Sequence, residues 1–456
     1  MAPSPLPLPP GLLLGATGAP AHAAAAGGHG LPFALLLSLT ALAFLGTLVF
    51  SRLAIQLRLP AVLGVLALGL LLHPSQDILS LEEVENLHVV SLSMLLFCSG
   101  LNAELHHLRG FLRYGVLLAV GGVVLTSLLF AALLWGIHAS LAALWPGLGI
   151  LALPVPVALM AAACVSCTDA MATLEVLRRA GLQLPQRLRA LVEMEASLND
   201  PLAILFLMLV AGLASAGWLQ PNSGGDPGEL LQALQSFLKS IGSGVMVGLI
   251  LTYVAQFILQ RFVSSSSQIL LLGIAVALSS YGLAQLLHGS GFISAFVTGL
   301  FLANDIYANQ WITPERLEHS LEPFNTLTEF SVFLLFGTLI DPASIGTALV
   351  PGLLSALALI LIARPLSVFA LQPLSPFGRR EGVLLAWCGL RGAVPLALAY
   401  TAIHTIPTLP GLEEGQVAAL EQQLQGLIFL VVVGSLCLQG LSLPPLCRRL
   451  GLAQAC

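Results

Sequence analysis

The residues best suited to chemistry lie in the apolar segment 189–216, where positions 195–201 read Glu-Ala-Ser-Leu-Asn-Asp-Pro. Pro201 lacks an N–H, so the carbonyl of Ser197 loses its helical hydrogen-bond partner and becomes available. A carboxylate, a free carbonyl, a hydroxyl and an amide within one turn suit an alkali cation. A carboxylate among apolar groups also holds a proton more readily than one in water. Asp200 could therefore bind a proton or a cation, and this competition would couple their transport.

The two acids of this segment point in different directions. At about 100° per residue, Glu195 and Asn199 share one helix face, whereas Asp200 points roughly 140° away from Glu195. The two carboxylates therefore need different partners. The structural alternative for Asp200 is an ion pair with a buried arginine.

Two other segments combine helix-breaking residues with a buried charge. Segment 148–178 contains prolines and then Ser-Cys-Thr-Asp at 166–169, and segment 381–405 contains Gly-Leu-Arg-Gly-Ala-Val-Pro at 389–395. Helices interrupted at corresponding places in two halves are the best sequence indication of a transporter's midplane site. We expect Asp169 and Arg391 to offset the opposed half-helix ends. Taken singly, each residue could equally be structural.

Composition determines which elements must position these residues. Of the 456 residues 57% are hydrophobic and only 9% are charged, against about a quarter charged in soluble domains. Apolar stretches near the ~20 residues needed to cross a bilayer recur along the chain. We therefore predict an all-α polytopic membrane protein with about thirteen spans. They are expected near 33–56, 59–73, 88–107, 111–137, 148–178, 189–216, 230–260, 267–287, 289–304, 320–341, 345–374, 381–405 and 418–443.

The distribution of basic residues predicts the orientation. Alternate connections hold nearly all the arginines, whereas those around 74–87, 138–147, 217–229, 341–344 and 405–417 hold neither Lys nor Arg. Positively charged connections face the cytoplasm. We expect the N-terminus outside and the C-terminus inside, in the inner membrane.

The ends of the chain look simple. Residues 1–30 lack the basic start of a signal peptide and are expected to form a flexible tail, followed by a membrane domain over 31–445 and a short cytoplasmic tail over 446–456. No further module is expected after the last span. Cys164 and Cys167 form C-x-x-C without further flanking ligands, which favours packed thiols over a metal site.

Five strings, in order, resemble the monovalent cation/proton antiporters, specifically the bacterial NhaP-like members of the sodium/proton-exchanger branch. They lie at 166–169, 195–201, 289–300, 363–365 and 389–395. The resemblance implies thirteen spans in two inverted repeats with crossed broken helices. It also implies a homodimer in which a mobile core, around 88–216 and 320–443, moves like an elevator against the remaining, dimerisation-side helices.

The resemblance also implies roles for individual residues. Asp200 is the expected ion-binding and proton-coupling aspartate, and the preceding Asn199 implies electroneutral one-for-one exchange of Na⁺ or K⁺ for H⁺. Thr168 would offer an oxygen to the ion, with Ser197 and Asp169 beside it. Glu195 and Arg364 would form a structural salt bridge. The implied physiological role is pH homeostasis.

Two positions depart from the family pattern. Cys98 stands in Phe-Cys-Ser-Gly-Leu at 97–101, where relatives often have an acid, and Ala196 replaces a frequent serine. Ser197 lies about 60° from Asp200 around the helix, against 40° for Ala196, so it could supply the hydroxyl. These changes could indicate a larger, more weakly held ion such as K⁺. Potassium-selective relatives, however, often carry cytoplasmic domains after the last span.

Two other functional classes can be weighed against an antiporter. A gated cation channel on the same fold would need a continuous wet path rather than a competitive carboxylate. An intramembrane hydrolase built on His106, His107 and Glu104 lacks H-E-x-x-H spacing; those histidines could sense pH or simply end a helix in solvent. Glu329 could line a cytoplasmic funnel. No cofactor and no nucleic acid are expected; the partners are the transported ions, membrane lipid and a second copy.

Overall fold

The computed structural model describes residues 33–57, 59–73, 81–103, 110–219, 227–305, 307, 313–452 and 454–455. The predicted tail over 1–30 and the His106–His107 pair lie outside these ranges. The described chain is helical, apart from the two-residue strands β1 (Leu182–Gln183) and β2 (Gln454–Ala455). The helices are α1 (Phe33–Gln56), α2 (Ala61–Leu71), α3 (Leu81–Leu101), α4 (Leu112–Leu144), η3 (Pro146–Leu148), α5 (Val155–Cys164), α6 (Ala170–Arg179), α7 (Gln186–Ser215), α8 (Pro227–Phe262), α9 (Ser266–Leu286), α10 (Gly291–Ala303), α11 (Pro314–Leu339), α12 (Pro342–Ala358), η4 (Leu359–Ala363), α13 (Arg364–Leu371), η5 (Gln372–Leu374), α14 (Arg379–Trp387), α15 (Ala393–Thr405), η6 (Ile406–Thr408) and α16 (Glu414–Leu450).

Each of the thirteen predicted segments contains helix in the structure. Within the described residues, seven helical stretches are long and apolar enough to cross a membrane, and further apolar helices are shorter. The segment 148–178 is broken between α5 and α6, and 381–405 is broken between α14 and α15. The chain is thus a multi-pass membrane protein in which two predicted spans are interrupted.

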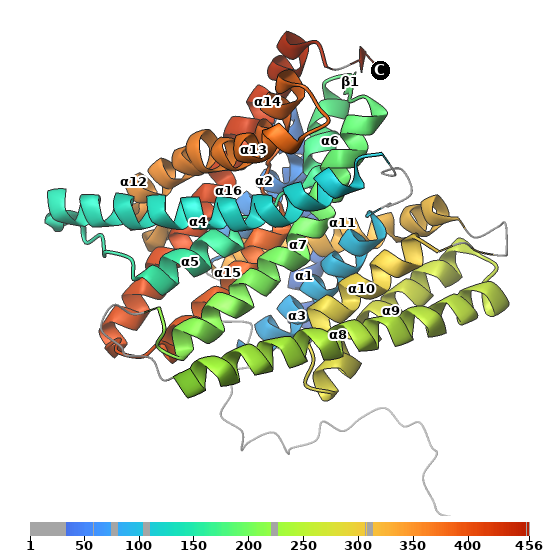
Figure 1. Ribbon diagram of the computed structural model, residues 1–456, viewed down its shortest axis with the longest axis horizontal. Helices are drawn as coiled ribbons and strands as arrows, with labels where there is room; N and C mark the ends of the chain where they lie inside the picture. Colours follow the sequence, from blue (N-terminus) through green and yellow to red (C-terminus); the bar gives the residue numbers. More distant parts are fainter. Residues whose placement is uncertain are drawn as a thin grey trace, which may run out of the picture.

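The helices pack as two groups (Figure 1). The crossing group consists of α4–α7 and α12–α16, in which α4 packs on α5, α7 and α13, and α16 packs on α12 and α15. The flanking group consists of α1–α3 and α8–α11, in which α10 packs on α3, α8 and α9, and α2 packs on α1 and α11. The groups meet where α3 contacts α7 and α15, where α11 contacts α15, and where α8 contacts α7. The core expected over 88–216 and 320–443 differs from this grouping, because it includes α3 and α11.

Close backbone contact explains why α3 belongs to the flanking group. A Cβ at Gly100 would overlap the carbonyl of Phe296, and one at Gly299 would overlap the carbonyl of Phe97. Small residues let transmembrane helices approach closely and gain van der Waals contact. This glycine pair therefore fixes α3 against α10.

The segment 446–456, expected as a short cytoplasmic tail, contains regular structure over its described residues. Helix α16 continues to Leu450, and β2 pairs antiparallel with β1, with Leu182 opposite Ala455. Arg448 also donates a hydrogen bond to the carbonyl of Ala180, at 3.1 Å. The last residues are thus attached to the connection between α6 and α7.

Candidate functional site

The two interrupted helices cross each other at their breaks. The backbone N–H of Asp169 donates to the carbonyl of Leu390 at 2.8 Å, which joins the first break to the second. Gly392 is required here, because a Cβ at this position would overlap the Asp169 carboxylate. The second break falls where the residues around 389–392 include two glycines, and Pro395 suits the first turn of α15 rather than a helix interior.

Both predicted charges contact the half-helix ends of the first break, although Arg391 itself belongs to the second. Asp169 is the N-cap of α6, and its side chain accepts a hydrogen bond from the N–H of Ala172 at 2.9 Å. Arg391 donates to the carbonyls of Ser166 at 2.9 Å and Cys167 at 2.5 Å, just beyond the end of α5. A negative group at a helix N-terminus and a positive group near a C-terminus both oppose the helix dipole. Each residue therefore compensates one cut end.

Glu195 and Arg364 form a buried ion pair inside the crossing group. Arg364 Nη2 lies 2.5 Å from Glu195 Oε1, and both side chains are almost completely buried. Pro365 follows Arg364 directly, and the π-helical turn η4 precedes it, which fits a proline that cannot donate to the preceding turn. Helix α7 supplies Glu195 on the face opposite Asp200, as the helical spacing predicts.

Asn199 does not face the same side as Asp200. It is fully buried, and in the orientation that satisfies both ends of its amide it donates to the carbonyls of Glu195 and Ala119, each at 3.1 Å. Its oxygen accepts from the Thr168 hydroxyl at 3.2 Å. The asparagine thus joins α7, α4 and the first break, and it is absent from the residues that line the cavity beside Asp200.

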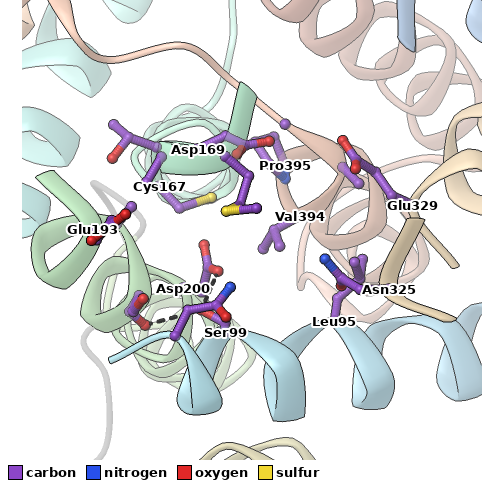
Figure 2. Close-up of a pocket in the computed structure, with 18 residues that line it drawn as sticks. Leu95, Ser99, Cys167, Asp169, Glu193, Asp200, Asn325, Glu329, Val394 and Pro395 are labelled. Atoms are coloured by element: carbon purple, nitrogen blue, oxygen red, sulfur yellow. Dashed lines mark hydrogen bonds between the residues drawn. The ribbon is translucent and has the colours of Figure 1, made fainter. Parts of the chain in front are cut away.

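That cavity has a volume of about 80 Å³ and lies where the two helix groups meet. Figure 2 shows Asp200 and Glu193 on one wall, with Asn325 and Glu329 of α11 on the opposite wall. The predicted residues Thr168, Asp169 and Ser197 also line it, as does Ala196. Four carboxylates, from Asp169, Glu193, Asp200 and Glu329, therefore border one small cavity, which favours a cation over an anion.

Ser99 is the residue that the sequence reasoning missed. Its hydroxyl lies 2.8 Å from Asp200 Oδ2 and 3.2 Å from the carbonyl of Ser197, the group freed by Pro201. Cys98, in contrast, packs into an apolar cluster with Met94 and Phe97. The signal for Ser99 was available, since Leu95, Ser99 and Asn102 share one helix face at i, i+4 and i+7 and all line the cavity.

Comparison with solved structures shows the class of fold. The chain matches the sodium proton antiporter MjNhaP1 of Methanocaldococcus jannaschii with a TM-score of 0.75 and 22% sequence identity, over 91% of this chain and 99% of that one. The protein therefore has the sodium/proton antiporter fold. The sodium/hydrogen exchanger transmembrane family model matches residues 40–449, so the chain belongs to the sodium/hydrogen exchanger family, a family of transporters rather than enzymes.

Two relatives illustrate the range within that family. The K(+)/H(+) antiporter NhaP2 of Shewanella oneidensis is 30% identical over 88% of this chain, which spans only 64% of that protein's length. The Na(+)/H(+) antiporter NhaH of Halobacillus aidingensis is 28% identical over 86% of this chain and 91% of its own. The first of these relatives is a K⁺/H⁺ antiporter and the second a Na⁺/H⁺ antiporter, so the cation differs between them.

Proposed function

We propose that this protein exchanges Na⁺ or K⁺ for H⁺ at Asp200. The proposal rests mainly on one observation: Asp200 lines the cavity, while the buried arginines of the crossing group have other partners. Arg364 pairs with Glu195, and Arg391 donates to the carbonyls at the end of α5. Of the ion pairs found between described residues, none includes Asp200. The absence of an Asp200–arginine pair among the described residues therefore favours the exchange role over the structural alternative.

The surroundings of Asp200 suit both a proton and an alkali cation. The carboxylate, the Ser197 carbonyl and the oxygens of Thr168 offer hard ligands from two elements. A proton on Asp200 removes the negative charge that attracts the cation, so Asp200 binds either a proton or a cation but not both. A single shared carboxylate carries one proton in one direction and one monovalent cation in the other. Exchange should therefore be one-for-one and electroneutral.

Proton efflux from acid-loaded proteoliposomes tests this proposal, with the membrane potential clamped and Na⁺, K⁺ or Li⁺ added in turn. We expect a pH dye to recover its fluorescence with at least one cation, and Asp200→Asn to abolish the response. A matched control is Asp341→Asn, which removes a partly exposed carboxylate that caps α12 and does not line the cavity.

Other outcomes would identify other functions. A gated channel would pass cations without proton countertransport, and Asp200→Asn would alter its current only partly. Silence of well-folded wild-type protein with every cation would contradict the proposed exchange. A rate that changes with membrane potential would contradict electroneutrality alone.

Three features of the mechanism are part of the same proposal. The cavity includes Glu193, whose neighbour on α7, Arg189, belongs to the predicted cytoplasmic side. We therefore place the opening toward the cytoplasm, with the N-terminus outside. We further propose that the chain consists of two inverted repeats, that the crossing group moves against the flanking group like an elevator, and that two flanking groups form a homodimer.

A further inference from the structure

The Ser99 hydrogen bond joins the two helix groups at the carboxylate itself. Ser99 belongs to α3 of the flanking group, whereas Asp200 and Ser197 belong to α7 of the crossing group. Other polar contacts also link the groups, from His88 to Thr401 and from Gln425 to Leu339. Neither of those contacts touches Asp200. Any sliding of α7 along α3 must break the Ser99 bond.

The strength of this bond depends on what Asp200 carries. A hydroxyl has one proton to donate, and its bond to an ionised carboxylate is roughly twice as strong as one between neutral groups. Protonation of Asp200 removes this charge assistance. A cation bound to Asp200 and the Ser197 carbonyl would occupy the two oxygens that accept from Ser99. A proton or a cation bound at Asp200 therefore weakens the Ser99 hydrogen bond. The bond is strongest when Asp200 is ionised and carries neither.

We propose that Ser99 is a positioning residue that tethers the unloaded carboxylate to the flanking group and so holds the empty carrier in place. The proposal rests on the exchange function proposed above. If the carrier could change sides with Asp200 carrying neither ion, it would move protons or cations alone, without exchange. A tether that is strongest in the empty state suppresses that return and keeps proton and cation movement coupled.

The test is the proton leak of Ser99→Ala in proteoliposomes that contain no alkali cation. Salts of N-methyl-D-glucamine replace Na⁺ and K⁺, a pH gradient drives the flux, and permeant thiocyanate balances the charge. Loss of a hydrogen bond to an ionised group should raise the leak roughly tenfold or more above wild type. Exchange with a saturating cation should persist, with more protons moved per cation.

Three further variants make the leak specific. Ser93→Ala removes a buried hydroxyl of the same helix whose hydrogen bond, among the described residues, goes to the carbonyl of Val90 on that helix, and it should leave the leak at the wild-type level. Ser99→Thr keeps a hydroxyl and should restore tight coupling. Ser99→Ala combined with Asp200→Asn should lose the leak, because the proton carrier is gone.

Each alternative result is distinguishable. If Ser99→Ala exchanges normally without added leak, the tether does not exist. If it raises the cation KM with coupling intact, Ser99 is a ligand of the cation and the proposal is wrong. A leak that survives Asp200→Asn would arise from damaged packing and would also overturn it. If wild-type protein itself exchanges no cation, the proposed function fails first.

Discussion

The two interrupted helices, α5–α6 and α14–α15, differ in how their cut ends are compensated. In the first, Asp169 caps α6 and Arg391 reaches across from the second break to the carbonyls that follow α5. In the second, α15 begins at Ala393 with Gly392 as its N-cap and no side-chain cap, and α14 ends at carbonyls contacted by Arg364 and Gln439. The arrangement of helices is similar in the two breaks, but their chemistry is not.

This difference assigns separate tasks to the two halves of the crossing group. The first half contributes the cavity acids Asp169, Glu193 and Asp200. The second contributes both buried arginines, and neither of them pairs with a cavity acid. The arginines neutralise structural groups, so the cavity keeps its negative charge. The following three predictions test that division, from the largest expected effect to the smallest.

Breaking the Glu195–Arg364 pair should have the largest effect on folding. Arg364→Gln leaves Glu195 buried without its partner, which should cost about 3–5 kcal/mol of stability, together with the weak contact at the second break. Thermal unfolding in detergent measures the loss, and Arg380→Gln, at an exposed arginine of α14, is the control. The exchanged pair, Glu195→Arg with Arg364→Glu, should fold better than either single variant. If it does not, the interaction between Glu195 and Arg364 does not contribute to the stability of the fold.

Removing Arg391 should damage the first break more than the second, although the residue belongs to the second. Arg391→Gln gives up charge-assisted bonds to the carbonyls of Ser166 and Cys167, and we expect a loss of about 2–3 kcal/mol. Hydrogen exchange, followed by mass spectrometry, should show faster exchange at the start of α6 than at the start of α15. Equal exchange at both breaks would contradict the proposed cross-compensation.

Two substitutions of Asp169 should distinguish its role as the N-cap of α6 from its negative charge in the cavity, with a smaller effect on stability than the two changes above. Asp169→Asn keeps an N-cap side chain, whereas Asp169→Ala removes it and should cost about 1 kcal/mol. Both variants remove one cavity charge, so both should raise the cation KM in the liposome assay. Only the alanine variant should lower the unfolding temperature. A normal KM in both variants would show that Asp169 serves α6 alone.

Periodicity and composition predicted the helical segments and the two breaks because both signals are local. They also placed Glu195 and Asp200 on different faces of one helix. The grouping of α3 and α11 was not predictable in this way, because it depends on contacts between distant segments such as Gly100 and Gly299. The same limit applies to Asn199, whose partners include Ala119 on another helix.

The departure at Cys98 illustrates how one position changes a conclusion. Neighbouring residues on a helix point about 100° apart, so the thiol packs among apolar side chains while the adjacent hydroxyl of Ser99 reaches Asp200. Although position 98 lacks an acid, a polar group, the Ser99 hydroxyl, therefore still contacts the Asp200 carboxylate. Looking at position 98 alone does not reveal the contact between Ser99 and Asp200. The helical spacing of Leu95, Ser99 and Asn102 does, because it places Ser99 on the face that lines the cavity.

The reach of Arg391 into the first break also determines when that break can be completed during synthesis. Arg391 follows Ser166 by 225 positions in the chain. At translation rates of about 5–20 residues per second, the arginine emerges roughly 10–45 s after the carbonyls that it serves. Throughout that interval the carbonyls of Ser166 and Cys167 lack their final hydrogen-bond partner. The hydrogen bonding of the first break can therefore be completed only after the second half has been made.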